Sequence, residues 1–401
     1  MTKFILLTLF LIFSLIKASN FEFRISGEQN KSNKSSYFFL PKDKETEYQI
    51  TSELIWKWQK YGLSSNSSLN FKKLEDGKYK KHLFLNELFY DSNLGDWEFS
   101  IGKKRLGYGV AQAFRPMDII QSETRRTLTP KETEGIPSFI LEKFTATGSI
   151  SLIYATQSSW RTKRIEIKKN NFVIRPYLLL GNWDILGILH TDDKGEFNLG
   201  IATSGVMGES WKIHFESLHK TQYYQWKSLL TKTNNYVGEP MYQKKMYNAF
   251  QAVVGANWTG QSGIGFLTEY WYDGTAYNKS KWEDLIDLSK SQTSLLSNLN
   301  WKEVAQNRIE SLEKTYKPKN LLQHNILFRF SFDGEIFNPE VDYLLTPQDM
   351  GNVTTFSIKN DITEKQKISF GFRLFGGPNN SAFGESKKSS TIFATWELAW
   401  E

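Results

Sequence analysis

Apolar and polar side chains alternate along most of this sequence. In DWEFSIGK, Trp97, Phe99 and Ile101 share one face of an extended chain, while Glu98 and Ser100 share the other. The same period recurs in the stretches 48–58, 150–154, 197–201, 211–216, 264–272 and 368–374. A period of two residues predicts β-strands that are apolar on one side and polar on the other.

The length and chemistry of these stretches favour a barrel that spans a membrane. Several exceed the ~5–6 residues usual in soluble sheets, and their polar faces carry charges. Strands of a transmembrane β-barrel turn one face to lipid and the other to the lumen, between short and long connections. We therefore predict an all-β fold, a transmembrane antiparallel β-barrel of roughly 14 to 16 strands, over residues 19–401. A soluble β-sandwich or propeller is the alternative, and the absence of a period of about 40–50 residues weakens the propeller.

Aromatic residues support the same prediction. They make up 15% of the sequence, which contains 13 tryptophans, and β-strands are enriched in them. Tryptophans at the ends of strands would form the girdle that marks a membrane–water interface. The candidates are Trp97, Trp183, Trp211, Trp258 and Trp400.

The amino terminus predicts export. Lys3 is followed by the apolar run Phe4–Ile16, and Ala18 and Ser19 come shortly after it. A basic start, a short apolar core and small residues at its end are typical of a secretory signal peptide, here residues 1–18. As an uncleaved anchor the run would be short, because a spanning helix needs ~20 apolar residues. The sequence has no cysteine, which excludes thiol catalysis and cysteine-based metal sites.

One region has a helical period instead. Ser280 with Glu283, and Asn300 with Glu303, have the spacing of capping boxes that begin helices. We predict a helical loop over residues 280–320, between two strands. Long loops without a function are uncommon. Two roles stay open for this loop: a lid or plug over the pore, and a plain cover for the barrel mouth.

The segment GKKRLGYGVAQAFRPMDII, residues 102–120, interrupts the alternation with basic residues, glycines and a proline. An extended course through lipid would cost ~2–4 kcal/mol for each charge at the midplane. The glycines make the backbone compliant and Pro116 bends it, so we predict that residues 103–135 leave the wall and fold into the lumen or over its mouth. Positive charge at a constriction favours anions. The predicted constriction residues are Lys103, Lys104, Arg105, Arg115, Asp118, Arg125 and Arg126. An exposed basic loop is the alternative.

Several motifs resemble those of Gram-negative outer-membrane porin-like proteins. The Gly-Lys at 102–103, the Gly-Tyr-Gly at 107–109 and the Pro-Met-Asp at 116–118 are similar to a strand end and Gly-rich turn of that family. The final stretch TIFATWELAW resembles the family's C-terminal signature, although Glu401 follows the terminal aromatic Trp400. The resemblance implies a passive channel in the outer membrane. Its partners would be outer-membrane lipid and lipopolysaccharide, small solutes and the barrel-assembly machinery, and a homo-oligomer stays open.

Catalysis and nucleic-acid binding find no support in the sequence. The five histidines form no H-x-x-x-H or H-E-x-x-H motif, and no G-x-S-x-G occurs. The net charge of +7 is not gathered into a basic stripe, so we expect no nucleic-acid partner. We predict a protein that is not an enzyme, with no catalytic residue, metal or cofactor.

These observations predict an outer-membrane channel for passive diffusion of small hydrophilic solutes. The basic residues of 103–126 would bias it toward anions. One alternative is a channel for hydrophobic compounds, which predicts an apolar pocket beneath the helical loop. Another is a non-conducting surface adhesin or binding protein, which predicts a lumen filled by side chains.

Overall fold

The structure of the chain is a computed structural model. It describes residues 19–73, 79–121, 128, 132–157, 169–231 and 238–400. The predicted signal peptide, residues 1–18, lies outside the described residues.

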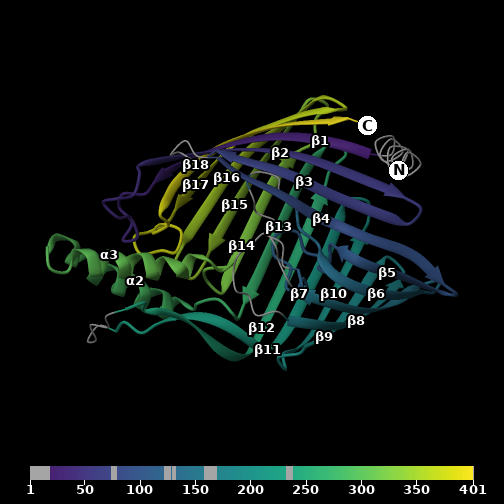
Figure 1. The fold of residues 1–401 in the computed structure, drawn as a ribbon, viewed down its shortest axis with the longest axis horizontal. Helices are drawn as coiled ribbons and strands as arrows, with labels where there is room; N and C mark the ends of the chain where they lie inside the picture. The colour runs from purple at the N-terminus through teal and green to yellow at the C-terminus, as the bar shows by residue number, and fades with distance from the viewer. Residues whose placement is uncertain are drawn as a thin grey trace, which may run out of the picture.

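Within the described residues, eighteen antiparallel strands form one closed sheet (Figure 1). Each strand pairs with the next along the chain, and β18 pairs with β1, which closes the ring. The strands are β1 Ser19–Ser32, β2 Thr46–Lys60, β3 Leu63–Lys73, β4 Tyr79–Leu94, β5 Trp97–Lys104, β6 Ile136–Phe144, β7 Gly148–Gln157, β8 Lys169–Leu180, β9 Trp183–Asp192, β10 Phe197–Met207, β11 Trp211–Ser228, β12 Met241–Thr259, β13 Ile264–Asp273, β14 His324–Phe332, β15 Phe337–Thr346, β16 Gly351–Thr363, β17 Gln366–Gly376 and β18 Lys388–Trp400. The predicted fold class, a transmembrane antiparallel β-barrel, is confirmed.

The barrel has more strands than the roughly 14 to 16 expected for the sequence. The alternation is hard to read over 20–46 and 220–246. β1 lies in the first of these stretches, and the second contains the ends of β11 and β12. Polar residues occur on both faces there, so the two-residue period fades where the strands continue.

The outer face of the wall is apolar and the inner face is mixed. In β10, Phe197, Leu199 and Ile201 are about half exposed, whereas Asn198 between the first two and Ala202 after the third are fully buried. The same alternation recurs around the ring, so large apolar side chains cover the outside. Such a surface fits hydrocarbon rather than water.

Tryptophans gather at one end of the barrel. Trp97, Trp183 and Trp211 start β5, β9 and β11, and Trp258 and Trp400 lie at the ends of β12 and β18. Because neighbouring strands run in opposite directions, all five lie at the end that carries the short turns. Aromatic side chains at this level are typical of a membrane–water interface.

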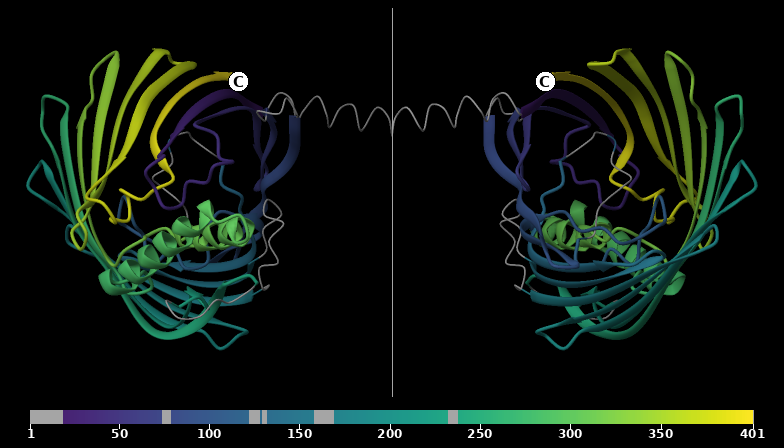
Figure 2. Two further views of the ribbon diagram at one scale, coloured as in Figure 1. Left: turned by 90° about the vertical axis from the view of Figure 1, so that its left-hand side faces the viewer. Right: turned by 90° about the vertical axis from the view of Figure 1, so that its right-hand side faces the viewer.

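The connection between β13 and β14 is helical, in the region where the helical loop 280–320 is predicted. It contains α2 Lys279–Ser294, η1 Leu295–Ser297, α3 Lys302–Leu312 and η2 Glu313–Tyr316. These helices lie across the mouth opposite the tryptophan end (Figure 2). Among the described helices, none has both the length and the apolar character needed to cross a bilayer.

The helix starts differ from the capping boxes that the sequence suggests. The N-cap of α2 is Asn278, whose side chain accepts a hydrogen bond from the Lys281 N–H at 3.0 Å. α3 starts after Trp301, which makes no side-chain cap. Asn has a strong N-cap preference, so Asn278 replaces Ser280 two residues earlier.

An apolar core fixes these helices to the mouth of the barrel. Trp282 is 1% exposed, and its indole N–H donates to the Asn380 carbonyl at 3.0 Å. The Tyr316 hydroxyl donates to the Ala382 carbonyl at 3.1 Å, in the connection between β17 and β18. The buried members of the cluster are Phe38, Leu230, Met241, Tyr277, Trp282, Leu285, Ile286, Leu288, Leu312, Leu321, Leu322 and Ala382. The space beneath the helices is therefore packed with side chains from four connections.

Candidate pore constriction

The connection between β5 and β6 turns into the barrel. Leu106, Tyr108 and Met117 pack against inward-facing residues of β6 to β11. Phe114 reaches Trp271 on β13, where the two ring centroids are 6.0 Å apart. Residues 105–121 therefore cross the lumen from their origin to the opposite part of the wall, and we call them the constriction loop.

A buried carboxylate on β11 anchors this loop. Glu216 is 0% exposed and accepts hydrogen bonds from the backbone N–H groups of Val110 at 2.9 Å, Ala111 at 3.3 Å and Met117 at 2.6 Å. A buried charge is tolerated only when hydrogen bonds satisfy it. The donors are backbone N–H groups of the loop. Glu216 therefore fixes the position of the loop backbone rather than the position of one loop side chain.

A second carboxylate, on β13, repeats this arrangement. Glu269 is 0% exposed and accepts from the N–H groups of Gln112 at 2.5 Å and Ala113 at 2.8 Å. His214 of β11 also contacts Glu269, with Nε2 2.7 Å from the carboxylate. Gly255 of β12 lies between them in the strand register. A Cβ at Gly255 would meet the His214 ring and lie 2.7 Å from Glu269 Cγ, so glycine lets the pair meet.

A carboxylate within the constriction loop, that of Asp118, stabilises the turn of the loop. Asp118 Oδ1 accepts from the backbone N–H groups of Tyr108 at 2.6 Å and Gly109 at 2.8 Å. Gly109 also approaches the wall closely. A Cβ there would lie 2.7 Å from Arg115 Cβ and 2.9 Å from Glu216 Oε1, a contact that real Cβ atoms avoid. Only glycine at position 109 therefore lets the loop backbone come close enough to bind Glu216.

The two lysines of β5 occupy successive positions of the strand, and each is paired with an acid. The Lys103 ammonium pairs with Glu134 at 2.5 Å. Lys104 faces inward and pairs with Asp91 at 3.0 Å.

The arginines of the loop also have partners. Arg105 Nε pairs with Glu87 at 3.1 Å, and Arg115 Nε donates to the Ala111 carbonyl at 2.5 Å. Each of these two guanidinium groups therefore has a partner within the described part of the chain. Arg125 and Arg126 lie outside the described residues.

Sequence reasoning missed the wall carboxylates. Glu216 lies in an ordinary alternating strand, and Glu269 lies in the middle of another. Their partners lie about a hundred positions or more away, as the bond from Val110 to Glu216 shows. The only local signal is an acid on the polar face of a strand, which is common in any barrel.

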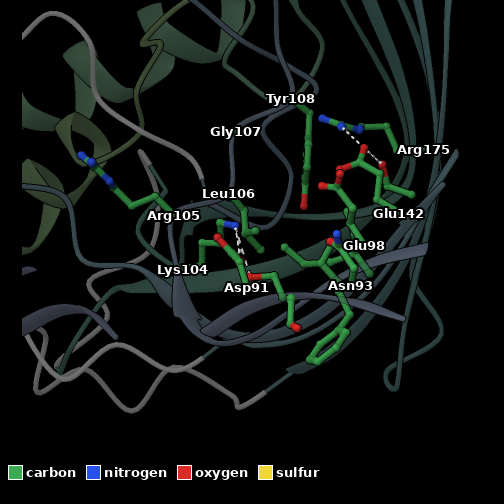
Figure 3. A pocket seen from close by; sticks show the side chains of 16 residues that line it. Asp91, Asn93, Glu98, Lys104, Arg105, Leu106, Gly107, Tyr108, Glu142 and Arg175 are labelled. Atoms are coloured by element: carbon green, nitrogen blue, oxygen red, sulfur yellow. Dashed lines mark hydrogen bonds and ion pairs between the residues drawn. The ribbon is translucent and has the colours of Figure 1, made fainter. Parts of the chain in front are cut away.

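A polar cavity of about 340 Å³ lies between the constriction loop and the inner face of β4 to β8 (Figure 3). Tyr108 extends from the loop toward it, and Glu142 and Arg175 form part of its wall. Burial is the main cause that raises the pKa of Tyr108 above its usual range, so its hydroxyl stays protonated. The lumen is therefore not filled by side chains at this level.

A second pocket, of about 570 Å³, is apolar and faces outward from β8 to β12. Its lining includes Leu178, Leu199, Ile201 and Phe250, all of which are exposed on the outer face of the wall. This apolar space lies on the lipid side and not beneath the helices.

Neither a protein-family model nor a curated protein matches the sequence. Solved structures do share the fold. OccAB1 of Acinetobacter baumannii superposes with a TM-score of 0.59 at 8% identity, over 95% of this chain and 96% of that one. OpdO of Pseudomonas aeruginosa gives 0.55 at 7% identity, over 95% and 96%. OccAB3 of A. baumannii gives 0.54 at 9% identity, over 95% and 98%. The chain thus has the fold of outer-membrane porins.

Proposed function

We propose that this protein is an outer-membrane channel through which small hydrophilic solutes diffuse passively. One observation carries the proposal: two buried wall carboxylates hold the backbone of residues 105–121 across the lumen. A fixed loop inside a closed barrel narrows an aqueous path without sealing it, which is what passive size selection requires. The neighbours in the solved structures support the fold of such a channel.

The apolar outer face and the tryptophan end support a membrane location for this channel. The proposed surroundings are outer-membrane lipid along the wall and lipopolysaccharide at the mouth that carries α2 and α3. Insertion would use the barrel-assembly machinery, with residues 1–18 as the export signal. Self-association into a homo-oligomer is compatible with the apolar exterior.

We further propose that the channel has a weak preference for anions, carried by the basic residues of the constriction loop, Arg115 among them. The preference is weak because Lys104 and Arg105 each pair with a carboxylate. A paired cation contributes little net field to the pore.

The two alternative functions are less favoured. A channel for hydrophobic compounds requires an apolar pocket beneath the helices, and that region is occupied by a packed core around Trp282. A non-conducting adhesin requires a filled lumen, whereas a cavity of about 340 Å³ lies beside the constriction loop.

Planar-bilayer recording of the refolded protein tests the proposal. We expect stable single-channel conductance and, in a KCl gradient, a small reversal potential of the sign that chloride permeation gives. Arg115→Gln should move that potential toward zero while the channel still opens. A folded barrel with no conductance would refute the channel, whereas an unchanged reversal potential in Arg115→Gln would refute only the anion preference.

A further inference from the structure

One row of inward-facing residues forms part of the floor of the polar cavity. In the register of the sheet, Asn93 of β4 lies opposite Glu98 of β5, and Glu98 lies opposite Glu142 of β6. Glu142 in turn lies opposite Ser151 of β7, and Ser151 lies opposite Arg175 of β8. The row therefore crosses five strands, and all five side chains line the cavity.

This row holds two acids and one base. Side chains directly opposite one another in a sheet have Cβ atoms about 4.5–5.5 Å apart, and like charges in such positions repel. Arg175 Nη2 compensates Glu142, 3.0 Å from its Oε1, and the Ser151 hydroxyl donates to the same carboxylate at 2.5 Å. Glu98 is exposed to the cavity and has no hydrogen-bond or ion-pair partner within the described part of the chain.

Tyr108 adds a second, independent observation. Its side chain is 5% exposed, and its hydroxyl has no hydrogen-bond partner among the described residues. The ring extends from the constriction loop toward the row (Figure 3), and the Arg175 guanidinium lies 5.6 Å from the ring centroid. A buried polar group without a partner is costly and marks a place where a ligand or water completes the hydrogen bonds.

The charges in the cavity decide which ligand fits. Lys104 and Arg105 also line it, but they are paired with Asp91 and Glu87. The carboxylate of Glu98 is therefore the uncompensated charge of the site. An anion placed here would face two carboxylates, whereas a cation would relieve the repulsion between them.

We propose that this cavity is a binding subsite for the cationic group, ammonium or guanidinium, of a small organic solute. Glu98 is the counter-ion, the Tyr108 hydroxyl accepts a hydrogen bond from the bound group, and Asn93 offers its amide to the rest of the solute. The volume of about 340 Å³ lies at the lower end of the ~300–1,000 Å³ typical of small-molecule sites. The subsite lies on the short-turn side of the constriction loop. A solute would therefore bind beside the constriction rather than within it.

Isothermal titration calorimetry with agmatine, on the refolded full chain in detergent, tests this subsite. We expect the wild type to bind agmatine and Glu98→Gln to weaken binding by about tenfold or more, the loss of one hydrogen bond between charged groups. Tyr108→Phe should also weaken binding by about tenfold or more, because the hydrogen bond that it removes has a cationic donor. Acetate, as an anionic probe, should show no binding.

The matched control is Glu209→Gln, which removes the same charge from an exposed position in the short turn between β10 and β11. It should bind agmatine like the wild type. Wild-type protein that does not bind agmatine, or equal affinities for Glu98→Gln and Glu209→Gln, would overturn the subsite. Because calorimetry needs no ion flow, a conducting barrel that does not bind agmatine refutes the subsite alone, and a non-conducting barrel that binds it refutes the channel alone.

Discussion

Two long connections occupy the lumen side of this barrel, and they are held by opposite means. The constriction loop, residues 105–121, is bound through its backbone by Glu216 and Glu269. The connection that carries α2 and α3 is bound through an apolar core around Trp282. The first crosses the lumen, whereas the second covers the mouth. A wall acid also contacts the second, because Asp273 of β13 accepts from the Asn320 amide at 2.8 Å, but its buried contacts are mainly apolar.

The difference teaches how each segment can act. Hydrogen bonds to a buried carboxylate are directional and short, so they set the position of a loop backbone closely. An apolar core is non-directional and tolerates small shifts of the elements that it joins. We therefore assign the control of pore width to the constriction loop and the cover of the mouth to the helices.

The largest effect is expected when both anchors are removed. In Glu216→Gln/Glu269→Gln, each amide presents an NH₂ group to backbone donors, and the loop loses its charged acceptors. We expect a loss of about 5 kcal/mol or more of loop anchoring, since bonds to charged groups contribute about 1.5–3 kcal/mol each. Single-channel conductance should rise as the loop leaves the lumen.

The control for this double variant is Glu340→Gln on β15, which removes an inner-wall charge that pairs with Arg329 at 3.4 Å. It should keep the wild-type conductance. Unchanged conductance in the double variant would show that the carboxylates do not set the pore.

Loosening the apolar anchor should give a different result. Trp282→Ala empties the centre of the core beneath α2, at a cost of about 3–5 kcal/mol. We expect faster proteolysis in 279–316 but the same size limit for solutes, because the constriction loop keeps its carboxylates. Leu299→Ala, at a side chain 90% exposed, should change neither. A larger size limit in Trp282→Ala would reverse the assignment of the two segments.

A smaller effect is expected at Gly255. An alanine there pushes His214 and Glu269 apart and should cost about 1–3 kcal/mol, the usual penalty of overpacking. Thermal unfolding in detergent should show a lower midpoint, and conductance should become noisier. Gly27→Ala on β1 is the matched control, because nothing lies within 4 Å of its added Cβ. Equal midpoints for both variants would contradict the steric role of Gly255.

The smallest effect is expected from the pH dependence of one ion pair, between Glu239 and Lys314, at the mouth that carries α2 and α3. Partial burial pushes the pKa of Glu239 up, but hydrogen bonds from Lys314 and Ser311 outweigh this and leave the pKa below its usual value. The Lys314 ammonium lies 2.8 Å from the carboxylate. A lowered pKa stabilises the folded contact above about pH 4.3, the usual Glu value, and the contribution is lost as pH falls through the folded pKa.

Limited proteolysis of α3 between pH 7 and pH 3 measures this contact. The wild type should become more susceptible in acid, and Glu239→Gln should already be susceptible at pH 7. A pH profile that is the same in both proteins would remove Glu239 from the account.

The sequence supports the fold better than the site. Alternation such as Trp97, Phe99 and Ile101 reports directly on a strand that separates lipid from lumen. The helical loop is also readable, because apolar periods are local signals, although neither Ser280 nor Asn300 is the N-cap of its helix. The structure has more strands than predicted, in part because the second half of β1, from Gly27 to Ser32, is polar on both faces.

The constriction was only partly readable. The glycines and Pro116 of 102–120 mark a segment that leaves the wall, and the structure places residues 105–121 inside the barrel. That the basic residues of this segment make the pore prefer anions remains a prediction. The residues that hold the loop, Glu216 and Glu269, are set by tertiary contacts that no local pattern contains.

Cysteine modification tests most directly whether the constriction loop is the narrowest part of the pore. The chain has no cysteine, so Gln112→Cys, at an exposed side chain on the loop, is a single target for a charged methanethiosulfonate reagent. We expect modification to lower single-channel conductance in discrete steps, while Leu299→Cys between α2 and α3 shows no change. Complete labelling at 112, verified by mass spectrometry, with conductance unaltered would contradict the account.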